Sequence, residues 1–177
     1  MKKTISIICL ILVFFFIYFL QSNFFTWFTI AGVMPNIFII LVLFMGLFMK
    51  KKIGMILGLI FGLYLDIILG KTVGISGILF ALIGLMGEIL SKSFSKDSKI
   101  TVIIMVIVAT AFYESIKYIF NMLITEGAVE ALAFAKILLI EIIFNTLITI
   151  IIFPIIKKSG YYLDDLFEDK KILTRYF

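Results

Sequence analysis

The chain has 177 residues, of which 63% are hydrophobic and 15% are charged, and its mean hydropathy is +1.24. A soluble domain is about 45–50% apolar, so this composition excludes an ordinary soluble globular protein. The sequence has no histidine and one cysteine, Cys9. These counts exclude imidazole bases, Ser-His-Asp and Cys-His nucleophile systems, an internal disulfide and most zinc sites. No glycine-rich nucleotide-binding motif is present.

Long apolar runs predict membrane-spanning helices, because one span takes about 20 apolar residues. We expect six spans, at about residues 4–20, 30–49, 53–69, 73–90, 100–124 and 132–156. The predicted fold class is therefore an all-α integral membrane protein, with a six-helix transmembrane bundle as one domain over residues 1–156.

The first apolar run follows Lys2 and Lys3, a pattern that a signal peptide and a membrane anchor share. The segment after the run, residues 21–25, contains no small-residue cleavage site of the A-x-A kind. We therefore expect a retained anchor. Pro35 and Asn36 open the second span, where the missing N–H of proline costs nothing.

Positive charge alternates between the loops. Of the 16 Lys and Arg residues, 13 lie on one set of sides, Lys71 lies on the other, and Lys117 and Lys136 lie within spans. Basic loops stay in the cytoplasm, so we expect both termini to be cytoplasmic. The net charge of +5 is thereby explained by topology, and we assign no lysine to nucleic acid.

Small residues form stripes on the third and fourth spans. The third-span stripe includes one acid, and its members are Gly54, Gly58, Gly62, Asp66 and Gly70. The fourth span continues the pattern with Gly74, Gly77 and Gly84. Such glycines allow close backbone approach, either between helices of this chain or to a partner's transmembrane helix. For Asp66, capping near an interface and a functional or partner role are both open.

Polar residues also lie inside the last two spans, where ionisable groups are costly and often functional. At about 1.5 Å per residue, they fall in the outer half of the bilayer. The predicted intramembrane polar cluster consists of Asp66, Glu114, Lys117, Lys136, Glu141 and Asn145. One interpretation is an ion-pair network that fixes helix register. The other is an outward-open cavity for a ligand or a partner helix.

The last segment, residues 157–177, mixes aromatic and charged residues. It is typical of a cytoplasmic amphipathic helix lying on the membrane, and docking on a partner is the alternative. Pro154 precedes it and is expected to bend or end the sixth span.

The chain resembles the rod shape-determining protein MreD family. The resemblance rests on Pro35-Asn36, on the run from Gly58 to Gly70 (GLIFGLYLDIILG) with Gly74 and Gly77 after it, and on Glu141, Asn145 and Pro154. It implies a non-enzymatic component of the bacterial cell-elongation machinery, without a cofactor. It also implies a fold similar to the substrate-binding S-components of energy-coupling-factor vitamin transporters.

The partners that the resemblance implies are MreC, RodA, a class B penicillin-binding protein and MreB filaments, besides membrane lipids and a second copy of the chain. The leading hypothesis is an adaptor whose glycine faces receive a helix of MreC. The alternative is a transporter subunit that binds a small molecule or a lipid-linked precursor. An enzyme is the third hypothesis, but no nucleophile or metal-ligand set is recognisable.

Overall fold

The computed structural model describes residues 2–49, 52–69, 74–125 and 130–167. The helices in these ranges are α1 (Lys2–Phe19), the π-helix η1 (Leu20–Phe24), α2 (Ile37–Phe48), α3 (Ile53–Ile68), α4 (Ile75–Ser93), α5 (Lys99–Thr125) and α6 (Ala131–Phe167). Within the described ranges there is no β-strand, only one isolated bridge between Ile30 and Val33. The all-helical prediction is confirmed.

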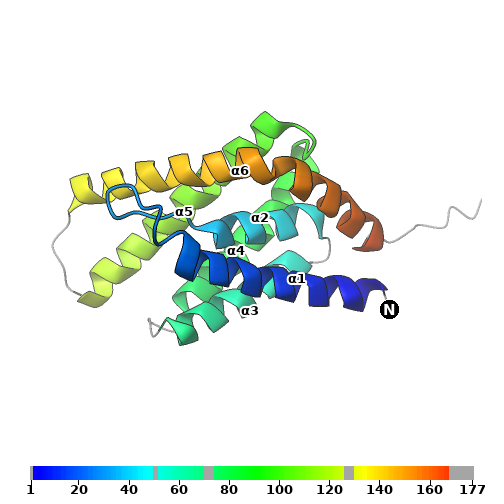
Figure 1. The fold of residues 1–177 in the computed structure, drawn as a ribbon, viewed down its shortest axis with the longest axis horizontal. Helices are drawn as coiled ribbons and strands as arrows, with labels where there is room; N and C mark the ends of the chain where they lie inside the picture. The colour runs from blue at the N-terminus through cyan, green and yellow to red at the C-terminus, as the bar shows by residue number, and fades with distance from the viewer. Residues whose placement is uncertain (1, 50–51, 70–73, 126–129, 168–177) are drawn as a thin grey trace, which may run out of the picture.

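The helices run alternately in opposite directions, so the chain connections fall at two ends of an elongated bundle. Figure 1 shows the start of α1, the end of α2, the end of α4 and the end of α6 at one end. The loop after η1 and the starts of α4 and α6 lie at the other. The basic segments gather at the first end. We call it the basic end. We call the opposite one the polar-pocket end, because a cavity lined partly by polar side chains opens there.

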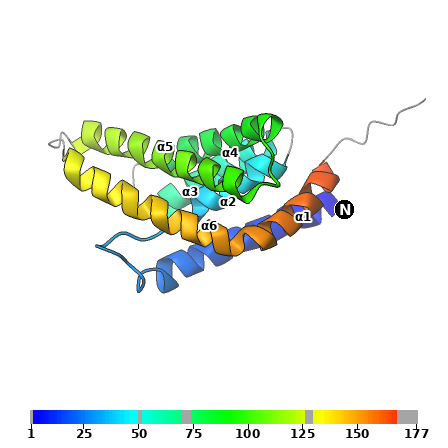
Figure 2. The ribbon, with the colours of Figure 1, turned by 90° about the horizontal axis from the view of Figure 1, so that it is seen from above.

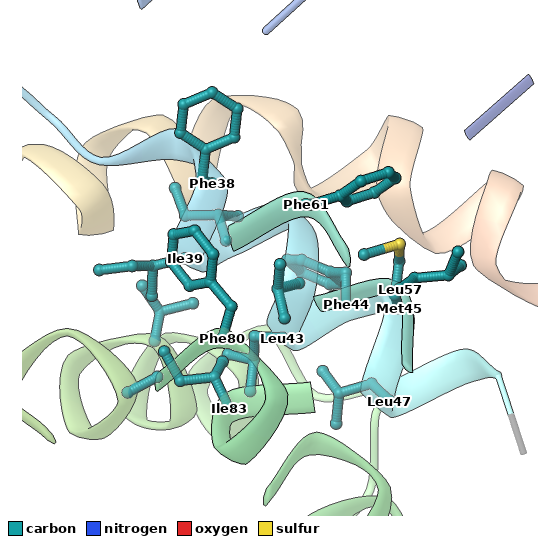
Figure 3. Packing of buried hydrophobic residues seen from close by; sticks show 14 of the residues in the cluster. Phe38, Ile39, Leu43, Phe44, Met45, Leu47, Leu57, Phe61, Phe80 and Ile83 are labelled. Atoms are coloured by element: carbon teal, nitrogen blue, oxygen red, sulfur yellow. The ribbon is translucent and has the colours of Figure 1, made fainter. Parts of the chain in front are cut away.

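The core of the bundle is α2, which packs against each of the other five α-helices. Figure 2 shows it between α1 and α6 on one side and α4 and α5 on the other. Nearly every side chain of α2 is buried because the helix is apolar on all faces. Figure 3 shows how Leu43 and Phe44 interdigitate with Phe61 of α3 and with Phe80 and Ile83 of α4.

The glycine stripes pack α3, α4 and α2 against one another. A Cβ on Gly58 would lie 2.6 Å from the carbonyl oxygen of Phe80, and one on Gly54 would lie 2.6 Å from the backbone nitrogen of Gly46. Gly62 faces Gly77, and Gly84 faces Gly54, in the same way. Gly54, Gly58, Gly62 and Gly84 therefore contact this chain's own backbone, in the intramolecular one of the two predicted uses.

Among the residues that the structure describes, four helical segments are long and apolar enough to cross a membrane: Lys2–Phe24, Ile75–Ser93, Lys99–Ile124 and Ala131–Phe167. The helices Ile37–Phe48 and Ile53–Ile68 are apolar but shorter. The second predicted span begins at residue 30, but α2 begins only at Ile37. Residues 30–35 are apolar but not helical, because Ala31 and Gly32 adopt left-handed conformations and Pro35 lacks an N–H.

The last helix continues beyond the predicted sixth span. Pro154 lies inside α6 and does not end it. The helix changes direction in its C-terminal half (Figures 1 and 2), as expected where a proline removes a backbone hydrogen bond. The predicted tail up to Phe167 is thus a continuation of α6, and residues 168–177 lie outside the described ranges.

Side chains of the α4–α5 loop hold this extension. Lys96 Nζ lies 2.6 Å from Asp164 Oδ2 and 4.9 Å from the centre of the Phe48 ring. Asp97 pairs with Lys157 at 2.9 Å and accepts a hydrogen bond from the Tyr161 hydroxyl. The first part of the predicted tail therefore packs on this chain's own basic end.

Candidate functional site

A cavity of about 450 Å³ opens at the polar-pocket end of the bundle. Its walls come from the ends of α1 and α3, from η1, from the start of α2 and the loop before it, and from α5 and α6. Glu114 and Lys117 of α5 line it together with Glu141 of α6. We call this cavity the polar pocket.

The loop before α2 shapes one wall of the polar pocket through a tight turn. Ile30 and Val33 exchange backbone hydrogen bonds of 3.1 and 3.0 Å. Between them, Ala31 and Gly32 have φ of 52° and 77°. Two successive positive φ values are the requirement of a type I′ turn, where glycine is favoured. The turn places Val33, Met34 and Pro35 on the wall of the cavity.

The charged residues of the pocket form one group. Lys117 Nζ lies 3.5 Å from Glu114 Oε1, one helical turn away on α5, and 5.1 Å from the centre of the Tyr113 ring. Glu141, on the facing helix, interacts electrostatically with Glu114 and Lys117. Two carboxylates thus share one ammonium, and the group has a formal charge of −1 when all three residues are ionised.

Asn145 lies one helical turn after Glu141 and links three helices beneath the group. Its Oδ1 accepts the backbone N–H of Asn36 at 2.9 Å, and its Nδ2 donates to Thr110 Oγ1 at 3.0 Å. The next N–H of α2, that of Ile37, is bound by Gln21 Oε1 at 3.3 Å. A helix start leaves such N–H groups unpaired, so Asn145 and Gln21 satisfy them from other helices.

Two buried oxygen atoms of the pocket residues have no hydrogen-bond partner in the described part of the chain. They are Oε1 of Glu141 and Oδ1 of Asn36. The Glu141 residue is only 5% exposed. A buried acceptor without a donor is costly, so these two atoms mark a position where a donor group is missing.

Asp66 is buried but does not line the polar pocket. Its Oδ2 accepts the backbone N–H groups of Gly74 and Ser76 at 2.9 and 3.0 Å. Gly74 is the residue before α4 and has a φ of 106°, which favours glycine. Asp66 therefore holds the start of α4 to the end of α3, in the geometry of a helix cap.

The other predicted site residues are placed as follows. Glu114, Lys117, Glu141 and Asn145 come together, while Lys136 is exposed and does not line the pocket. Asn36 is the residue before α2, directly after the buried Pro35. Gly70 lies outside the described residues.

Sequence reasoning missed Gln21 and Thr110 as members of the site. Both carry a signal in retrospect. Gln21 is an amide at the end of the first apolar run, and η1, a π-helix of the kind frequent at functional sites, carries it into the pocket wall. Thr110 precedes Glu114 by four residues, so it lies on the same helical face. The glycines Gly46 and Gly87, which contact each other, were also missed.

The described residues contain no group of three or more His, Cys, Asp or Glu side chains that could hold a metal ion. The chemistry available in the pocket is therefore that of two carboxylates, an ammonium, amides and hydroxyls. Such a set can bind a polar group at the membrane or exchange protons with it.

A family model described as rod shape-determining protein MreD matches residues 1–159 of the chain. The comparisons with curated proteins and with solved structures gave no match.

Proposed function

The chain belongs to the rod shape-determining protein MreD family, and from this membership we propose that it is a membrane adaptor of the bacterial cell-elongation machinery. In this role it binds MreC and helps to position lateral peptidoglycan synthesis. The family implies a part in rod-shape determination and is not a known enzyme family. The observation that carries the proposal is the match over residues 1–159, which includes all seven helices except the end of α6.

The charge distribution supports a definite orientation of this adaptor. The basic end carries Lys2, Lys3 and Lys52, together with Lys96 of the α4–α5 loop and Lys92 and Lys99 at the helix ends beside it. By the positive-inside rule, we propose that this end, with both termini, faces the cytoplasm in a six-span arrangement. The polar pocket then opens toward the cell exterior, on the side where peptidoglycan is built.

We propose a partner surface for the adaptor that lies outside the glycine stripe. Gly58 and Gly62 are buried against α4 of the same chain, which supports a contact with MreC elsewhere. The exposed apolar faces of α1 and α6 remain available, with Leu12, Phe16 and Phe19 on α1 each more than half exposed. We propose these faces for contact with MreC, and through it with RodA, a class B penicillin-binding protein and MreB filaments.

The adaptor role is tested by depletion of the protein in its native host, followed by microscopy. We expect rod-shaped cells to become round. Co-purification of MreC with the tagged chain tests the contact separately. Cells that remain rods and show a nutrient-uptake defect would contradict the adaptor role.

A second candidate function is favoured by the polar pocket itself. We propose as the alternative a subunit that binds a small molecule or a lipid-linked precursor, in the manner of a vitamin-transporter S-component. A cavity with both charged and apolar walls is the usual form of a ligand site. Native mass spectrometry of the purified chain distinguishes the two functions, since a stoichiometric small ligand is expected only of the second.

A further inference from the structure

Among the charged side chains of the polar pocket, carboxylates outnumber ammonium groups. Its three charged side chains, Glu114, Lys117 and Glu141, sum to −1 when ionised. The ammonium nitrogen of Lys117 lies 3.5 Å from Oε1 of Glu114. Oε1 of Glu141 accepts no hydrogen bond from any described residue, although Glu141 is only 5% exposed.

A second acceptor lies in the same wall. Oδ1 of Asn36 is also buried and without a partner among the described residues. Two neighbouring amides already bind other groups. Asn145 directs its Nδ2 at Thr110, and Gln21 uses its Oε1 to accept the N–H of Ile37. Asn36 and Glu141 are held near one another because Asn145, one turn from Glu141, binds the backbone of Asn36.

We propose that the polar pocket binds an ammonium or guanidinium group, with Glu141 as its main acceptor and Asn36 as its second. A cation of this kind donates several hydrogen bonds and neutralises the excess negative charge, and such charge-assisted bonds are the stronger ones. The remaining walls include Phe38, Leu65, Leu69 and Ile137, so an apolar chain that carries the cation also fits. The ligand class is therefore a primary amine or guanidine on an aliphatic stem.

The same chemistry has two sources: a small free amine, or a Lys or Arg side chain on a segment of a partner protein. Both place one cationic donor beside Glu141. This inference does not rest on the adaptor role, because it concerns what the pocket recognises and not what the complex does in the cell.

The test uses the full chain in detergent and two matched probes, n-butylammonium and n-butanol, which differ in the charge of one terminal group. We expect the ammonium to raise the thermal unfolding midpoint in proportion to the logarithm of its concentration, and the alcohol to have no such effect. In Glu141→Gln, which keeps the shape but removes the charge, the apparent affinity should fall about tenfold or more.

A matched control is Glu130→Gln, an exposed carboxylate of the same end that does not line the pocket, and it should bind the ammonium as the natural chain does. If Glu141→Gln fails to fold, Asn36→Ala and Glu114→Gln carry the test, and each should weaken binding. The two sources are separated with an apolar peptide that carries one lysine and its counterpart that carries norleucine. Binding of only the lysine peptide assigns the site to a partner side chain, and binding of the free amine assigns it to a small ligand.

The proposal is overturned if butanol stabilises the chain as well as butylammonium does. It is also overturned if the pocket variants bind the ammonium as tightly as Glu130→Gln, or if neither the amine nor the lysine peptide binds. These results leave the adaptor role untouched, since depletion and co-purification of MreC test that role independently.

Discussion

Asn145, in the middle of α6, accepts the backbone N–H of Asn36 at 2.9 Å, and so it holds the start of α2 from a position 109 residues away in sequence. The same side chain donates to Thr110 of α5. Three helices thus meet at one buried amide beneath the polar pocket. The start of the central helix is therefore positioned by tertiary contacts rather than by its own cap.

Asn145→Leu should destabilise the fold. The substitution leaves the N–H of Asn36 buried without an acceptor, and we expect a loss of about 1–3 kcal/mol in the free energy of unfolding. Unfolding of the purified chain by sodium dodecyl sulfate measures it. Asn23→Leu is the control, because the Asn23 side chain is exposed and donates to the backbone oxygen of Phe19, four residues earlier. Equal stability of the two variants would show that the amide does not hold α2.

Gly58→Ala should disturb the packing of α3 on α4 before it affects any partner. A Cβ at this position would lie 2.6 Å from the Phe80 carbonyl oxygen, and overpacking of this kind costs about 1–3 kcal/mol. Ile60→Ala, at an exposed position on the same helix, is the comparison for the unfolding measurement. A Gly58→Ala chain of unchanged stability that no longer co-purifies with MreC would restore the glycine face as the partner surface.

Asp66→Ala should loosen the junction of α3 and α4 more than Asp66→Asn does. The alanine removes the single oxygen, Oδ2, that accepts the N–H groups of both Gly74 and Ser76, whereas asparagine keeps one side-chain oxygen that can accept them. Loss of such a cap typically costs about 1 kcal/mol, and up to about 2. The unfolding free energies of the two variants, beside that of the exposed control Asp165→Ala, measure the difference. A larger effect of asparagine than of alanine would contradict the capping role.

The contact between the α4–α5 loop and the end of α6 should weaken in acid. Hydrogen bonds from Tyr161 and Lys157 hold the pKa of Asp97 below its usual value of 3.8. Because the folded pKa is lowered, the stabilisation is fully present above the usual value and is lost as the pH falls through the lowered one. The stability difference between the natural chain and Asp97→Asn should therefore be larger at pH ~7 than at pH ~3.

Tyr161→Phe should reduce this difference at neutral pH, because it removes the first of the two hydrogen bonds to Asp97. A difference that stays constant over the whole pH range would show that the Asp97 carboxylate does not hold the helix end.

The order of the helices, the basic end and most of the charged group could be predicted from the sequence. Apolar length, lysine placement and helical spacing carry that information, and Glu114, Lys117 and Glu141 do line one pocket. These features depend on patterns within one helix or one loop. The family, too, was identified from short motifs that lie within single spans.

The positions of Asp66 and Lys136 could not be predicted in the same way. Depth along a helix placed both with the charged group, but the direction of a side chain depends on which helix lies beside it. Asp66 turns toward the backbone of the α3–α4 junction, and Lys136 is exposed. The late start of α2 was also missed, because hydropathy does not show that residues adopt left-handed backbone conformations. The length of α6 was missed because hydropathy does not show that a helix continues through an internal proline.

The shortness and complete enclosure of α2 have a consequence for how the protein is made. At about 1.5 Å per residue, 12 residues reach only about 18 Å, well short of a hydrocarbon layer of about 30 Å. Side chains of the neighbouring helices, rather than lipid, surround this segment. During synthesis, the packing around α2 is therefore complete only after α4, α5 and α6 have been made. The final position of this early segment thus depends on segments that are made last.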